Sequence, residues 1–594
     1  MNASVQKAFL LAALFFAATM VSAQEALKSI EEEYYDFLAL QGITFRPTLN
    51  YRTLSDSVWS IDTETKTVTD EDGNEQTVEE PLAHPWQYNN LGKMRTLWQS
   101  QELSKNGYLR GVPQGVFLKI YGPEWYNSFN TAAPYGQNDG ALWQGKGYNT
   151  SLTAGARLEV YGLELTIKPQ VSFSQNMAFD YIKPNYAGTD KDGNPTIFSG
   201  GAAEYGYYGV TSIDAPQRFG NKPFFTFDWG DTEVRYSWHT LTIGFGTQTI
   251  WLGPAQLNPI IHSNNAPSYP KFDIGLRKQR IVIPKLGWYL GDLELRCWWG
   301  KLCESDYFDT IDSNDSNLIS GVSAAWSLPW IFKGLTIGIN RTMLSKWDDI
   351  SAYSLFEILI PGIGTSGRHD DSDQRFSFTI DYRVPKIGLE LYFEWARNDF
   401  SPDMDFIIRY PFHTQGWTFG ARKAFDLPKS FRLGISLELT FLECSADYDR
   451  LINWYSTFYA HHIITQGYTN RGQWLGAGIG TGGNSQYLGI DLYFPKGFVT
   501  VFGQRRNPDL DYTMYIDAKN DADNIKNGQF NAEGNIRCLL SFGIKSSYFI
   551  TRSMLLSGSY VFTDERNPLN ISKKDRSSNH RYNNSFQLGI KYNF

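Results

Sequence analysis

The sequence predicts an all-β fold, a transmembrane antiparallel β-barrel of 16 to 18 strands. Three observations carry this prediction: an N-terminal export signal, repeated ten-residue runs of alternating apolar and polar residues, and short turns that alternate with long polar loops. Residues 110–594 hold the alternating runs, and about 25–28 residues for each strand and its link give the even strand number that such barrels have.

The export signal occupies residues 1–23. Lys7 supplies the positive charge, residues 8–21 form an apolar stretch, and Val21-Ser22-Ala23 offers the small residues of a cleavage site. The apolar stretch is too short to span a membrane comfortably. We therefore expect a cleaved signal peptide and localisation in the outer membrane.

Alternation is clearest at the C-terminus. Phe586, Leu588, Ile590, Tyr592 and Phe594 alternate with polar residues or glycine, which gives a strand one apolar and one polar face. Similar runs occupy residues 151–160, 376–383, 433–441 and 536–544, and about ten residues suffice for a tilted strand to cross a bilayer. Phe594, a terminal aromatic on such a strand, resembles the signal read by the barrel insertion machinery, which we expect as a partner during biogenesis.

A soluble sandwich also alternates, but two features favour the barrel. The polar faces carry charges that a core would reject and a water-filled lumen would accept: Arg157, Glu159, Asp381, Arg383, Glu390 and Glu394. Short Pro-Lys links also recur between the runs, at residues 284–285, 385–386, 428–429 and 495–496. The longer links, at 309–317, 369–374 and 507–535, are expected at the opposite rim.

The chain is predicted to divide into a signal peptide (1–23), an N-terminal helical plug region (24–109) and the barrel (110–594). Apolar residues recur at helical spacing over residues 24–41, and Gly42 stands where a helix would end. Asp72-Gly73 predicts a hairpin turn within the polar segment that follows.

Composition excludes several classes of protein. The formal charge is −8 with no basic stripe, which argues against nucleic acid as a partner. The mean hydropathy of −0.36 argues against a bundle of membrane helices. Aromatic residues make up 15% of the chain, which argues against disorder and suits the girdles of a barrel in contact with outer-membrane lipid.

Catalytic and cofactor motifs are lacking in the sequence. Residues 478–483 match G-x-G-x-x-G without the strand–turn–helix context, and the acidic run 312–317 lacks the glycine and distal glutamate of a calcium loop. His369-Asp370-Asp371 is the one local candidate for a hydrolase, and a charged loop tip explains it better. We expect no enzyme, no cofactor and no metal site. Cys297 and Cys303 could form a disulfide or remain free thiols.

Some aromatic residues fall on polar faces or in loops, namely Trp143, Trp251, Trp298 and Trp474. Sugar rings stack on exposed aromatic faces, while Asn, Asp and Arg bind hydroxyls and acidic groups. This composition suits a polysaccharide ligand.

Two segments carry a family resemblance. Trp251-Leu-Gly253-Pro254 is followed by Ser263-Asn264-Asn265-Ala266-Pro267-Ser-Tyr-Pro270, and this pair resembles the hallmark of the Wzi capsule-assembly family. Residues 34–54 and the run Asn138-Asp139-Gly-Ala-Leu-Trp143-Gln144 also look like family segments. The family commonly has W-W-G-P-G where this chain has Trp251-Leu-Gly-Pro-Ala255, so the ligand is the feature most open to divergence.

The resemblance implies an 18-stranded barrel with a helical periplasmic plug. Its implied role is lectin-like: binding exported surface or capsular polysaccharide and helping to assemble or retain it on the cell. The hallmark residues are candidates either for polysaccharide contact or for turns within the lumen, and Asn138, Asp139, Trp143 and Gln144 are candidate contacts. A general diffusion porin is the alternative function.

Overall fold

A computed structural model of the chain describes residues 29–69, 75–93, 103–105, 107, 110–182, 188–189, 195–196, 205–207, 213–309, 311–360, 372–398, 404–443, 458–461, 463–511, 536–569 and 579–594. The predicted export signal, the hairpin tip at 72–73, the run 369–371 and Cys444 lie outside the described residues.

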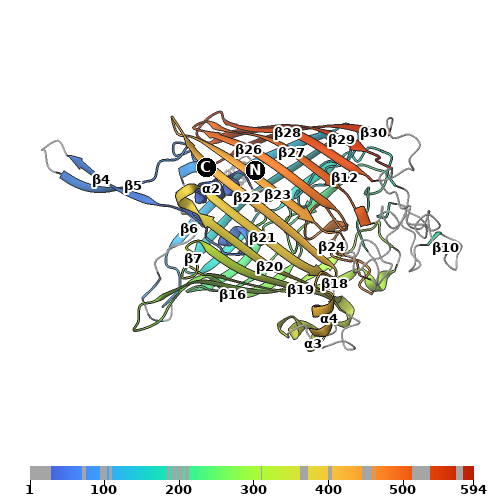
Figure 1. The fold of residues 1–594 in the computed structure, drawn as a ribbon, viewed down its shortest axis with the longest axis horizontal. Coiled ribbons are helices and arrows are strands. Elements are labelled where there is room, and N and C mark those ends of the chain that lie inside the picture. The colour runs from blue at the N-terminus through green and yellow to red at the C-terminus, as the bar shows by residue number, and fades with distance from the viewer. Residues whose placement is uncertain are drawn as a thin grey trace, which may run out of the picture.

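A closed antiparallel barrel dominates the fold (Figure 1). Its strand segments are β6 (Val116–Asn130), β7 (Gly147–Val160), β8 (Leu163–Ile167), β9 (Gln170–Ser174), β12 (Phe224–Asp228), β13 (Glu233–Trp238), β14 (Leu241–Gly246), β16 (Lys271–Val282), β17 (Tyr289–Cys303), β18 (Ser316–Ser327), β19 (Leu335–Lys346), β20 (Ser372–Val384), β21 (Leu389–Asn398), β22 (Gln415–Leu427), β23 (Phe431–Phe441), β26 (Asn484–Phe494), β27 (Gly497–Asn507), β28 (Cys538–Phe549), β29 (Met554–Arg566) and β30 (His580–Tyr592).

Two of the barrel strands are interrupted. Both β8 and β9 pair with β7, while β12 pairs with β9 and β13 pairs with β8. The segments β8 and β9 therefore form one interrupted strand, and β12 and β13 form another. The described barrel therefore has 18 strands, and the predicted fold class is confirmed. Its last strand, β30, pairs with its first, β6, which closes the sheet and leaves no edge unpaired.

Alternation places apolar side chains outside and polar side chains inside. On β30, Phe586 and Leu588 are 50% and 51% exposed on the outer surface, whereas Ser585 is buried inside. On β17, Cys297 and Cys303 are both free thiols, so they do not form the disulfide that the sequence left open. Phe594 lies just beyond β30 and is exposed.

The two rims differ as the sequence predicts. Pro495 and Lys496 alone join β26 to β27, and a single turn of 3-10 helix (Pro385–Ile387) joins β20 to β21. The links from β17 to β18, from β19 to β20 and from β27 to β28 are long, and the strand ends that they join lie at the opposite rim (Figure 1). We call the two ends the short-turn rim and the long-loop rim.

The N-terminal helix α2 spans Ile30–Ala39 and ends two residues before the predicted position 41, while residues 24–28 of the predicted stretch lie outside the described residues. The Ser29 side chain caps the helix by accepting a hydrogen bond from the Glu32 N–H (3.2 Å). Three glutamates in the first turn interact favourably with the positive end of the helix dipole. The helix ends before Gly42, which takes a left-handed φ of +72°. Its apolar face packs against the barrel wall, where Phe37 stacks on Tyr493 at 4.5 Å.

Small elements complete the described structure. Short strand pairs are β1 (Thr44–Phe45) with β3 (Ser60–Ile61), β2 (Tyr51–Arg52) with β15 (Trp251–Leu252), β10 (Gly188–Thr189) with β11 (Pro195–Thr196), and β24 (Thr469–Asn470) with β25 (Gln473–Trp474). The hairpin β4 (Thr63–Thr69) with β5 (Glu75–Pro81) projects beyond the short-turn rim, and α3 (Ala352–Phe356) and α4 (Met404–Arg409) lie outside the barrel wall (Figure 1). Among the described residues, no helix is long and apolar enough to cross a membrane.

Two buried ionic clusters fasten the N-terminal segment to the barrel wall. In the first, Arg46 binds Asp36 (2.5 Å), Asp381 (3.0 Å) and Glu390 (2.6 Å), and Arg422 also binds Asp36 and Glu390. Residues 29–56 therefore lie inside the barrel, where strand charges find partners.

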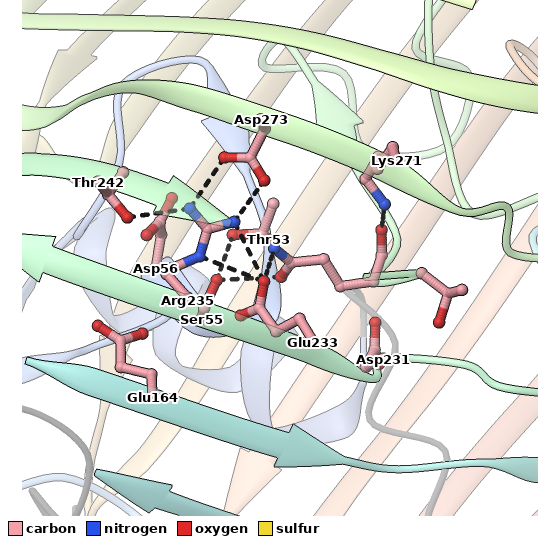
Figure 2. A network of polar contacts seen from close by, with 12 residues as sticks. Thr53, Ser55, Asp56, Glu164, Asp231, Glu233, Arg235, Thr242, Lys271 and Asp273 are labelled. Atoms are coloured by element: carbon pink, nitrogen blue, oxygen red, sulfur yellow. Dashed lines mark hydrogen bonds and ion pairs between the residues drawn. The ribbon is translucent and has the colours of Figure 1, made fainter. Parts of the chain in front are cut away.

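The second cluster centres on Arg235 (Figure 2). This guanidinium lies between Asp273 (2.6 Å) and Glu233 (3.1 Å). Asp56, from the N-terminal segment, joins the cluster through Arg277 and Arg296.

Candidate functional site

The segment between β14 and β16 folds into the lumen and carries the first half of the family hallmark. Trp251 is completely buried, and its indole N–H donates to the Ala255 carbonyl at 3.0 Å. The Gly253 N–H donates to the Asn50 carbonyl at 2.9 Å, and its φ of +83° suits glycine. Pro254 accepts from the Gln256 side chain at 3.0 Å. These residues build a lumenal turn.

Wall carboxylates hold this turn in place. Glu438 accepts from the backbone N–H groups of Gln256 (2.7 Å), Leu257 (3.1 Å) and Asn258 (2.7 Å). Glu394 accepts from the Ile260 N–H at 2.8 Å. The sequence predicted such charges to face a water-filled lumen. They do face inward, but they are buried against segments that fill the lumen.

The second half of the hallmark meets the segment 138–144. Ser263 donates to the Gly476 carbonyl (2.6 Å) and accepts from the Asn265 N–H (3.0 Å). The Asn138 N–H donates to the Asn265 side chain at 3.1 Å, and the Gly140 N–H donates to the Asn264 carbonyl at 2.9 Å. Two motifs that the sequence placed about 120 residues apart therefore form one layer across the lumen.

The remaining hallmark residues are packed within the lumen. Ala266 is buried in the apolar core of the lumen. The Pro267 carbonyl accepts from the Asn470 side chain at 3.0 Å, and the Pro270 carbonyl accepts from the Lys301 N–H at 3.0 Å.

A pocket of about 250 Å³ opens above this layer, on the side of the long-loop rim. We call it the outer pocket. Its aromatic lining comprises Trp143, Phe179, Tyr181, Tyr207 and Trp474, and its polar lining includes Asp139, Gln144, Asn265 and Gln473. Three of the four candidate contacts predicted at 138–144, and Asn265 of the hallmark, thus line one cavity.

Not every predicted aromatic faces this pocket. Trp143 and Trp474 line it, and they pack against Phe219 (4.9 Å between ring centroids) and Tyr207 (5.4 Å). Trp251 and Trp298 lie on the lumen side, as predicted, but they are fully buried in its core and so offer no exposed ring face to a sugar.

Charged residues complete the lining of the outer pocket. Glu565 on β29 binds Arg537 (2.5 Å) and Arg581 (2.7 Å). Arg506 on β27 lies over the Tyr135 ring, 6.0 Å from its centroid. Sequence reasoning missed all four charged residues. The available signal was their position on lumen-facing sites at strand ends beside long loops.

Asp139 adds a titratable group to the pocket. Burial raises the pKa of its carboxyl to about 7, against opposing contributions from the Gln144 side chain, Lys545 and the Gln137 backbone. Its charge therefore changes near neutral pH.

A second cavity of about 380 Å³ lies on the other side of the layer, towards the short-turn rim. We call it the inner cavity. Phe37 of α2 faces Tyr126, Tyr487 and Lys545 of the wall across it, and Asp139 lines both cavities. The layer formed by the two motifs separates them.

Comparisons with known proteins agree with this architecture. The family model described as "Capsule assembly protein Wzi" matches residues 128–575. Among solved structures, Escherichia coli Wzi is described as an outer membrane protein involved in group 1 capsule assembly and a carbohydrate-binding β-barrel. It is 13% identical, has a TM-score of 0.51, and the match covers 79% of this chain and 84% of that chain.

Two other solved structures are less similar to this chain. OccAB4 of Acinetobacter baumannii is 8% identical with a TM-score of 0.37, and the match covers 81% of this chain and 98% of that chain. OprB of Pseudomonas putida is 10% identical with a TM-score of 0.34, covering 81% and 94%. No curated protein sequence matches the chain significantly.

Proposed function

The chain belongs to the Wzi capsule assembly family, and we propose that it binds exported surface polysaccharide, in the manner of a lectin, in the outer pocket. Through this binding it would help to assemble or retain capsular polysaccharide at the cell surface. It is an outer-membrane β-barrel, and we also propose that its signal peptide is cleaved after Ala23 and that Phe594 engages the barrel insertion machinery.

The observation that carries the proposal is the composition of the outer pocket. Trp143 and Trp474 offer aromatic surface, and Gln144, Asn265 and Gln473 offer amide donors and acceptors. Apolar ring faces beside a few convergent polar groups suit a sugar, whose C–H faces stack while its hydroxyls form hydrogen bonds. The pocket lies near the long-loop rim, where an exported polymer would be met.

The described interior does not favour a diffusion porin. Side chains of the wall, such as Trp298 and Leu344, share one apolar core with lumenal residues such as Ile260, Tyr459 and Leu475. Such packing leaves little room for a wide aqueous path. Residues 29–56 occupy further lumen volume.

Deletion of the gene tests the proposal. We expect surface polysaccharide to move from the cell-bound to the released fraction, and complementation with the wild-type gene should restore retention. Trp474→Ala should restore it poorly, since an aromatic contact contributes about 1 kcal/mol. Trp330→Ala is the matched control because Trp330 is 60% exposed at the short-turn rim. Unchanged retention in the deletion strain would refute the proposal.

A further inference from the structure

The outer pocket holds a surplus of positive charge. Its lining includes the guanidinium groups of Arg506, Arg537 and Arg581 and the carboxylates of Glu565 and Asp139. Glu565 is shared by Arg537 and Arg581, and both of these pairs are largely buried. The single negative charge of Glu565 is therefore shared between two positive charges. The positive charge of Arg506 is additional to these.

Among the residues that the structure describes, Arg506 has no acidic partner in this pocket. No carboxylate of the described chain lies within ion-pair distance of its guanidinium, and its Nε is buried without a hydrogen-bond acceptor. Leaving a buried charged donor unsatisfied is unfavourable. An anionic group of a ligand, placed beside Arg506, would remove this cost.

The side chain of Arg506 is also placed for such a role. It alternates with Arg505 along β27, so the two arginines point to opposite faces of the barrel wall. Arg505 faces outward with Val501 and donates to Gln486 at 2.6 Å. Arg506 faces the pocket, where the ring of Tyr135 limits its freedom. A planar guanidinium held in this way can form two parallel hydrogen bonds to an acidic group.

We propose that the outer pocket selects polysaccharides that carry an acidic substituent, and that Arg506 is the residue that recognises it. Arg537 and Arg581, held by Glu565, add positive potential to the pocket, while Trp143 and Trp474 contact the sugar ring. The inference rests on the proposed function, because it names the class of glycan bound at the same site. The shared chemistry is an anionic oxygen group, either a sugar carboxylate or a phosphate or sulfate ester.

The test uses the full-length barrel in detergent and surface polysaccharide from the source cells, separated by anion exchange into neutral and acidic fractions. We expect the acidic fraction to bind and its affinity to fall with added salt. Arg506→Gln should weaken that binding about tenfold, since a hydrogen bond to a charged group contributes that much. Arg505→Gln, the matched control on the outer face, should leave it unchanged, and Arg506→Lys should weaken it less than Arg506→Gln.

Carboxyl reduction of the acidic fraction distinguishes the two sources of charge. Loss of binding on reduction identifies a sugar carboxylate, and retained binding identifies a phosphate or sulfate ester. Equal binding of the neutral fraction, or equal effects of Arg506→Gln and Arg505→Gln, would overturn the inference while leaving polysaccharide binding in place. Binding of neither fraction would overturn the proposed function, and the inference with it.

Discussion

The guanidinium of Arg296 on strand β17 donates to the carboxylate of Asp56 in the N-terminal segment at 2.7 Å. Arg277 on the neighbouring strand binds the other oxygen of Asp56 at 2.5 Å. Burial alone would raise the pKa of Asp56, but Arg296 and Arg277 outweigh it and hold the pKa below its ordinary value. One aspartate therefore ties the N-terminal segment to two strands.

Asp56→Ala should destabilise this attachment by about 2–3 kcal/mol, because Arg296 and Arg277 each lose a hydrogen bond to a carboxylate, although Asp273 and Glu164 still pair with them. Limited proteolysis of the N-terminal segment in the folded barrel measures the effect, and we expect faster cleavage. Glu64→Ala is the control, since Glu64 pairs with Lys66 on the exposed hairpin. Equal cleavage of the two variants would contradict the role given to Asp56.

The same pair predicts a response to acid. Because the pKa of Asp56 is lowered on folding, its contribution to stability is present above about pH 3.9, the value for an unperturbed aspartate, and is lost only as the pH falls towards the lower folded value. The N-terminal segment should therefore resist proteolysis equally at pH 5 and pH 7. Release of the segment already at pH 5 would show that Asp56 does not hold it.

Glu438 should matter although it lies below the outer pocket. It anchors three consecutive backbone N–H groups, so Glu438→Ala should lower thermal stability by about 2–3 kcal/mol and loosen the layer beneath the pocket. Thermal unfolding of the purified barrel measures the loss of stability, and the affinity for polysaccharide measures the loosening of the layer. Glu438→Gln keeps an acceptor and should lie between Glu438→Ala and wild type. Wild-type values for Glu438→Ala would show that the turn needs no anchor.

Asp139 should make polysaccharide binding depend on pH. Its carboxyl, with a pKa raised to about 7 by burial, is mostly neutral at pH 6 and mostly ionised at pH 8. Ionisation adds negative charge to the pocket and offsets the positive charge of Arg506, Arg537, Arg581 and the nearby Lys545. Affinity for an acidic glycan should therefore fall a few-fold between pH 6 and pH 8. Asp139→Asn should remove this pH dependence. An unchanged pH profile in that variant would show that another group causes the dependence.

Conductance in planar bilayers should be small. The apolar core that joins Trp298 and Leu344 of the wall to Ile260 and Leu475 of the lumen segments obstructs the described interior. We expect no steady large conductance from the wild-type barrel. A stable open level like that of a general porin would favour the alternative function.

The barrel was predictable because its signal is local. A strand with a lipid face and a lumen face must alternate, so β30 and β7 were visible as runs of period two. The Pro-Lys turns were visible for the same reason, since a tight link must contain residues that fit it. The end of helix α2 was predicted to within two residues, because Gly42, which takes a left-handed φ, marks the stop locally.

The site was predictable only in part. Asp139, Trp143, Gln144 and Asn265 were singled out from segments of family-like sequence, and they do line one pocket. The hydrogen bond between the Asn138 N–H and the Asn265 side chain depends on how two loops fold into the lumen. No local sequence pattern encodes this arrangement. The arginines were missed because a charge on a lumen-facing position looks the same whether it meets water, a lumenal segment or a ligand.

Equilibrium binding of purified barrel to total surface polysaccharide tests the central claim most directly. The account predicts saturable binding by wild-type protein and by Trp330→Ala, and an affinity about five- to tenfold weaker for Trp474→Ala, which removes one aromatic side of the outer pocket. Absence of saturable binding by the wild type, or equal affinity of Trp474→Ala and Trp330→Ala, would contradict the claim that this barrel holds polysaccharide in its outer pocket.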